Sequence, residues 1–143
     1  MTIWFDMDGT LADLYSVENW LPKLRACDPS PYIEAVPLLR LCTLARLLNH
    51  LQRNGYEIGI ISWLSKDPDP EYNELVTLAK MQWLKKHLSS VHWNEIYIVP
   101  YGTPKQEVCG PGILFDDEEP NRRAWGDGAH DATEIIEVLK SLL

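Results

Sequence analysis

Short apolar runs separated by longer helical patterns limit the folds that are open to this 143-residue chain. Four runs are apolar on both faces of the pleat, and they cover residues 3–5, 58–61, 96–99 and 113–115. Strands that are covered by helices on both sides have this composition, so the runs predict central strands of a parallel sheet and not edge strands. The alternation therefore predicts an α/β fold, a Rossmann-like, doubly wound parallel sheet.

Three longer helices are expected around these strands. Leucines at helical spacing, followed by a glycine, predict the first over residues 38–54. The second covers residues 70–88 and carries lysines near its end, where positive charge suits the helix dipole: Lys80, Lys85 and Lys86. The third closes the chain from about Ala132, and a brief fifth strand is expected before it, near residues 129–130.

Residues 13–37 differ from the rest of the chain, because they hold four of its ten prolines and fit no strand of the sheet. One short helix, over residues 17–25, is expected within them. We interpret residues 13–37 as a small insertion folded over the end of the first strand, within a single domain that covers residues 1–143.

The charge balance argues against several classes of partner. With 13 Lys and Arg against 21 Asp and Glu, the net charge of −8 repels polyanions, so we expect neither a nucleic-acid polymer nor a membrane as partner. The three cysteines are scattered and lack metal-ligand spacing, which predicts reduced thiols in a cytoplasmic protein. The sequence begins without a basic leader, and no stretch is apolar enough for a signal peptide or a membrane span.

Acidic residues stand where two of the predicted strands stop: Asp6 and Asp8 after the first, Asp116 and Asp117 after the fourth. The carboxyl ends of parallel strands share one edge of the sheet, so these four acids can converge in a single crevice. Mutual repulsion would raise their pKa values, and a hard divalent cation is the simplest remedy. Oxygen ligation by few protein groups favours Mg²⁺ as this cation.

Groups that could bind phosphate oxygens follow the same strand ends. Ser62 directly follows the second strand, and Lys105 lies in the loop after the third. The Gly9 backbone amide and Thr10 stand beside the acids. Because hydroxyl, ammonium and loop amide groups bind phosphate, these residues and a metal ion predict a phosphoryl site.

In order and placement, the chain resembles the haloacid dehalogenase (HAD) superfamily through four motifs: Asp6-Met7-Asp8-Gly9-Thr10, Ser62, Lys105 and Asp116-Asp117. The match spans residues 3–121, and the stretches 5–13 and 114–121 are most similar to the 5′(3′)-deoxyribonucleotidase branch with its small bacterial and phage relatives. The resemblance implies the HAD fold, with a reduced cap after the first strand.

The resemblance also implies a role for each matched residue. Asp6 would attack phosphorus and form an aspartyl-phosphate, and Asp8 would act as the acid and base. Mg²⁺ would be held by the Asp6 carboxylate, the Asp8 backbone carbonyl and Asp116, with Asp117 supporting directly or through water. Ser62 and Lys105 would orient the transferring group, and Asn121 would fix the Asp117 side of the site.

The sequence thus predicts a Mg²⁺-dependent phosphomonoester hydrolase for a small phosphorylated substrate, with nucleoside monophosphates as candidates. Two alternatives stay open: an HAD-like protein that binds a phosphorylated ligand without hydrolysing it, and a phosphotransferase with an acceptor other than water. Aromatic residues of the insertion, Tyr15, Trp20 and Tyr32, could stack on a base or form the insertion's own core. With so small a cap, the site could be open, closed by a second copy of the chain in a homo-oligomer, or suited to bulky substrates.

Overall fold

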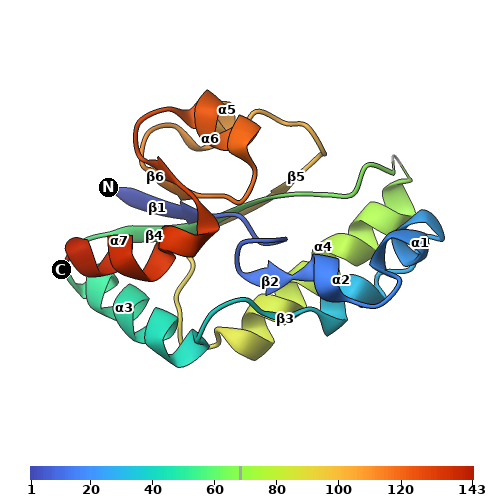
Figure 1. Cartoon of the computed structure of the whole chain (residues 1–143), viewed down its shortest axis with the longest axis horizontal. Helices are drawn as coiled ribbons and strands as arrows, with labels where there is room; N and C mark the ends of the chain where they lie inside the picture. Colours follow the sequence, from blue (N-terminus) through green and yellow to red (C-terminus); the bar gives the residue numbers. More distant parts are fainter. Residues whose placement is uncertain (68) are drawn as a thin grey trace.

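A five-stranded parallel sheet with the order β5-β4-β1-β6-β7 forms the centre of the molecule. The computed structural model describes residues 1–67 and 69–143 (Figure 1). The strands of the sheet are β1 (Thr2–Phe5), β4 (Glu57–Trp63), β5 (Glu95–Val99), β6 (Ile113–Phe115) and β7 (Ala129–His130). This sheet confirms the predicted α/β, Rossmann-like fold class and the brief fifth strand.

Alternation along β1 divides the apolar core between the two faces of the sheet. Ile3 and Phe5 lie in the larger cluster, with leucines of α3 (Leu41–Arg53) and residues of α7 (Ile135–Ser141). Trp4 points to the other face, where α5 (Lys105–Cys109) and α6 (Glu119–Trp125) pack. Figure 1 shows these two pairs of helices on opposite sides of the sheet. Since both faces are covered, a strand here must be apolar at every position.

The segment between β1 and α3 is built from short elements. It holds η1 (Leu14–Ser16), α1 (Trp20–Arg25) and α2 (Ser30–Glu34), and α2 packs against α4 (Pro70–His87). A two-stranded antiparallel ladder, β2 (Ala12–Asp13) with β3 (Val36–Pro37), joins the start of the segment to its end. In Figure 1 the segment and α4 extend to one side of the sheet.

Several predicted boundaries and one strand position are corrected by the structure. The run at residues 96–99 is not central, because β5 is the edge of the sheet. The first long helix starts at Leu41 and not at 38, since the Leu38 amide donates to the Leu11 carbonyl and extends the β2–β3 ladder. The helix over 17–25 is shorter, and the last helix begins with a 3₁₀ turn, η2 (Ala132–Glu134).

No helix in the described part of the chain is long and apolar enough to cross a membrane.

Gly59 in β4 is dictated by Trp4 on the neighbouring strand. A Cβ at position 59 would lie 2.5 Å from Cζ3 of the Trp4 ring, which is 3% exposed and stacks on Tyr97 with centroids 5.6 Å apart. We therefore expect Gly59→Ala to destabilise the protein by about 1–3 kcal/mol, the usual range for overpacking. Urea denaturation measures this loss. In a Trp4→Leu background Gly59→Ala should cost less than in the wild type, and strictly additive losses would contradict the contact with Trp4 as the cause.

Candidate active site

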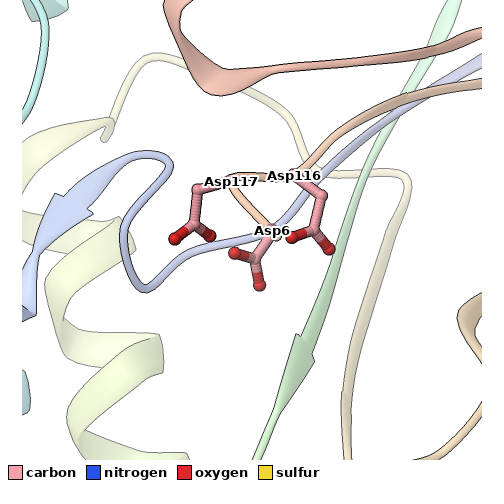
Figure 2. A group of neighbouring side chains, drawn as sticks. All are labelled: Asp6, Asp116 and Asp117. Carbon is pink, nitrogen blue, oxygen red and sulfur yellow. The ribbon is translucent and has the colours of Figure 1, made fainter. Parts of the chain in front are cut away.

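Three carboxylates meet where β1 and β6 end side by side. The register pairs Phe5 with Phe115, and the Asp6 amide donates to the Phe115 carbonyl at 3.0 Å. The next residues along both strands are therefore neighbours, and carboxylate oxygens of Asp6, Asp116 and Asp117 lie within 4.8 Å of one another (Figure 2). The expected convergence of acids from the two ends of the sequence is present for these three.

Lys105 neutralises part of this cluster. Its Nζ lies 2.9 Å from Oδ1 of Asp6 and 2.7 Å from Oδ2 of Asp116, and the residue is 3% exposed. Burial alone would lower the pKa of Lys105, but the charges of Asp6 and Asp116 outweigh it and hold that pKa above its ordinary value. Lys105 is the first residue of α5 and not a loop residue, so the helix fixes its direction.

Asp8 is not one of these three carboxylates and pairs instead with Lys80 of α4. Its Oδ2 lies 2.9 Å from Nζ of Lys80, and the same ammonium donates to Ser62 Oγ at 2.7 Å. Burial raises the pKa of the Asp8 carboxyl, and the Lys80 charge opposes this shift without cancelling it. The predicted site residues thus form two adjoining groups, one around Lys105 and one around Lys80.

The prediction that Lys80 serves the helix dipole is wrong, since the residue is 1% exposed. It lies on the buried face of α4, four residues after Val76 and three before Trp83. A lysine in line with these apolar residues was the signal in the sequence, because a buried ammonium needs an acceptor of opposite charge.

Gly9 and Thr10 also differ from the sequence prediction, because neither presents the expected group for phosphate. The Gly9 amide donates to the Ala12 carbonyl at 2.8 Å, inside a turn. The Thr10 hydroxyl donates to Oδ2 of Asp6 at 3.0 Å and accepts from the Asp117 amide at 3.2 Å. Both residues therefore hold the acids in place.

The turn requires glycine at position 9. Its φ of +81° lies in the left-handed region, and a Cβ there would come within 2.7 Å of the Asp117 carboxyl carbon. Asn121 was expected on the Asp117 side, but its Nδ2 donates to Oδ2 of Asp116 at 3.2 Å.

The charges of the site do not balance. Four carboxylates face two ammonium groups, which leaves two negative charges uncompensated. Burial, followed by the charge of Asp6, raises the pKa of Asp116 to about 6 and that of Asp117 to about 8. When all four carboxylates are ionised, this all-oxygen donor set with two excess negative charges fits a hard divalent cation, which Asp6, Asp116 and Asp117 would hold.

The acids lie in a cavity of about 710 Å³ that extends toward the insertion. Asp6, Asp8, Lys105 and Asp116 line it at the sheet edge. Five aromatic side chains are part of the remaining lining: Tyr15, Trp20, Tyr32, Trp63 and Tyr101. Leucines and charged residues, among them Arg25 and Lys66, line it as well. The cavity therefore combines an acidic end with a mixed aromatic, aliphatic and charged lining.

Four of the five aromatic residues form two pairs, one within the insertion and one at the ends of β4 and β5. Tyr15 and Trp20 of the insertion meet edge to face with centroids 5.0 Å apart. Trp63 is the last residue of β4, Tyr101 follows β5, and their ring centroids are 4.9 Å apart. Tyr15 is 45% exposed, whereas Tyr32 is buried in the cluster between the insertion and α4. Tyr15 is thus exposed enough to contact a ligand in the cavity, whereas Tyr32 is part of the apolar core between the insertion and α4.

Comparison with known proteins identifies the fold and leaves the family open. No family model and no curated protein matches the chain. Solved structures do match, among them D,D-heptose 1,7-bisphosphate phosphatase from B. bronchiseptica, complexed with magnesium and phosphate, at 10% identity and a TM-score of 0.59 over 99% of both chains. The enzyme of that name from Burkholderia thailandensis matches at 12% identity and a TM-score of 0.56, over 99% of this chain and 97% of the other.

The raised pKa of Asp117 predicts how stability depends on pH in the absence of divalent cations. The folded protein keeps this proton up to pH of about 8, whereas an unfolded aspartic acid loses it near pH 3.8. Between these values unfolding releases a proton, so the free energy of unfolding should fall as the pH rises. Thermal melts in EDTA from pH 4 to 9 should show a steeper fall for the wild type than for Asp117→Asn.

Mg²⁺ should stabilise the wild type at pH 8, because a ligand that binds only the folded state raises its stability by mass action. The rise in Tm should be smaller in Asp117→Asn. Equal pH slopes in EDTA, or equal Mg²⁺ responses, would contradict the assignment of Asp117 to the cation site.

Proposed function

We propose that this chain is a Mg²⁺-dependent phosphomonoester hydrolase of the HAD superfamily that works through an aspartyl-phosphate on Asp6. The observation that carries the proposal is the placement of Asp6, Asp116 and Lys105 together at one end of a cavity, with Asp117 next to the two acids and the Asp8–Lys80 pair beside them. The fold supports it as well, because the matching solved structures include phosphatases and one of them holds magnesium and phosphate.

In this proposal Asp6 is the nucleophile and Asp8 the acid and base. An Asp6 carboxylate oxygen attacks phosphorus, a P–O bond to Asp6 forms, and the bond to the leaving oxygen breaks while that oxygen takes a proton from Asp8. Water then attacks phosphorus, gives a proton to Asp8, and releases phosphate and the free Asp6 carboxylate. Both oxygens of Asp6 are held in the structure, one by Lys105 and one by Thr10, so the nucleophile is oriented before substrate binds.

The remaining site residues handle charge. Asp6, Asp116, Asp117 and the Asp8 backbone carbonyl would hold Mg²⁺, which when bound neutralises phosphate charge among the acids. Lys105 adds a second positive charge near Asp6, and the Ser62 hydroxyl provides a donor for a phosphate oxygen.

The aromatic part of the cavity favours an ester with an aromatic leaving group, and nucleoside monophosphates are our first candidates. Stacking on aromatic side chains contributes about 1–3 kcal/mol per base in single-stranded nucleic-acid sites. Two aromatic pairs line this cavity. In this proposal residues 13–37 act as the cap that selects the leaving group, while the sheet edge performs the chemistry.

Asp6→Asn tests the mechanism. Without its carboxylate nucleophile the variant should lose phosphate release by at least about a thousandfold, given the scale of losses when a covalent nucleophile is removed. The wild type should require Mg²⁺ and lose activity in EDTA. The assay is phosphate release from p-nitrophenyl phosphate, with Asp127→Asn, an exposed aspartate outside the site, as the matched control.

Persistent turnover in Asp6→Asn would contradict the covalent mechanism. A wild type that binds phosphate without releasing it from any ester would favour the non-catalytic alternative. Transfer of phosphate to an added alcohol in preference to water would favour a phosphotransferase.

Trp20→Ala tests the substrate proposal. Because the variant loses one stacking contact with the base, KM for a deoxynucleoside monophosphate should rise about tenfold. KM for glycerol phosphate, which has nothing to stack, should change little. Steady-state kinetics on both esters and on a sugar bisphosphate provide the measurement, and Ile33→Ala, an exposed residue of the insertion, is the control. Equal effects on all esters would contradict base stacking.

A further inference from the structure

Lys80 has three hydrogen-bond acceptors in the structure and no part in the chemistry described above. Its ammonium donates to Asp8 Oδ2 at 2.9 Å, to Ser62 Oγ at 2.7 Å and to the Trp63 carbonyl at 2.7 Å. A lysine ammonium has three N–H bonds, so each of them is used. The side chain is 1% exposed and therefore has one well-defined position.

Stability alone is a weak explanation for an ammonium at this place. Taking a charge out of water costs free energy, and replacing a buried ion pair by apolar residues of similar size is often neutral or stabilising. The neighbouring positions of the same helix face, Val76 and Trp83, are apolar. An apolar residue at position 80, with a neutral one at position 8, would fit this face.

The contact with Ser62 decides how this hydroxyl is used. Lysine cannot accept a hydrogen bond, so Ser62 must be the acceptor, and its own proton is left to donate elsewhere. Ser62 is 1% exposed at the carboxyl end of β4, next to the cavity-lining Trp63. The contact with Lys80 thereby leaves the Ser62 hydroxyl proton available to donate to another group.

The contact with Asp8 fixes a carboxylate that also lines the cavity. Lys80 binds it through Oδ2 and reaches it from α4, whereas Asp8 lies in the loop after β1. Lys80 also lies 5.2 Å from the centroid of the Tyr32 ring, which belongs to the insertion. One side chain thus contacts the loop with the acids, the end of β4 and the insertion.

We propose that Lys80 is a positioning residue that holds the Asp8 carboxylate toward the leaving oxygen and the Ser62 hydroxyl toward phosphate. This inference rests on the proposed function and adds to it a residue on a helix that carries none of the matched motifs. The proposal predicts that loss of Lys80 lowers kcat most for esters whose leaving oxygen needs a proton from Asp8.

Two phosphate esters separate this effect from a general loss of activity. The p-nitrophenolate ion departs without a proton, whereas the alkoxide of glycerol phosphate needs one. Lys80→Met keeps the length and removes the charge, and it should lower kcat on glycerol phosphate about ten- to a hundredfold more than on p-nitrophenyl phosphate. Any loss through Ser62 acts on the phosphate and should affect both esters alike.

One control tests whether the effect acts through Asp8, and others exclude misfolding as its cause. In an Asp8→Asn background, Lys80→Met should add no further difference between the esters, because the proton donor is already absent. Lys85→Met, on the exposed side of the same helix, should match the wild type. Circular dichroism establishes that Lys80→Met is folded, and Lys80→Gln, which keeps one donor, takes its place if it is not.

The outcomes separate this proposal from the proposed function. A selective loss on glycerol phosphate that disappears in the Asp8→Asn background supports a positioning role. An equal loss on both esters in an active and folded Lys80 variant overturns the positioning of Asp8 and leaves only that of Ser62, and no loss overturns both. Either result leaves the phosphatase assignment intact. A wild type that hydrolyses neither ester overturns both.

Discussion

Repulsion among four carboxylates is the constraint to which the rest of the structure responds. Parallel strands bring Asp6 and Asp8 next to Asp116 and Asp117, because the ends of β1 and β6 are neighbours in the sheet. Two buried lysines offset part of this charge, and each comes from a helix that begins far along the sequence. The strand order β4-β1-β6 in the sheet is therefore needed to place these charged groups together, as well as to form the apolar core.

The two lysines divide the acids by the tasks proposed for them. Lys105 pairs with Asp6 and Asp116, to which we assign the proposed nucleophile and cation-holding roles, whereas Lys80 pairs with Asp8. Separate partners keep a group that must exchange protons away from groups that must stay ionised to bind a cation. Two carboxylates placed only two residues apart thereby acquire different environments, which is how one loop can supply both a nucleophile and an acid.

The sequence predicted the centre of the sheet well because β1, β4 and β6 are buried on both faces and are largely apolar. It predicted the gathering of Asp6, Asp116 and Asp117 because strand ends share an edge, and it placed Lys105 correctly next to them. It misjudged Lys80 because helical periodicity does not say whether a lysine beside apolar residues is solvated or paired. The edge position of β5 was missed because strand order depends on contacts between segments distant in sequence.

The short ladder between β2 and β3 has a consequence for how such a protein can change. Ala12 pairs with Pro37 and Asp13 with Val36. The two ends of the segment between them are therefore adjacent, and the segment joins the rest of the protein through this two-stranded ladder. Doubling the length of a segment closed in this way costs only about 0.6 kcal/mol in loop entropy. Because this ladder closes the segment, a different segment could replace residues 14–35 while the acids a few residues upstream, Asp6 and Asp8, keep their places.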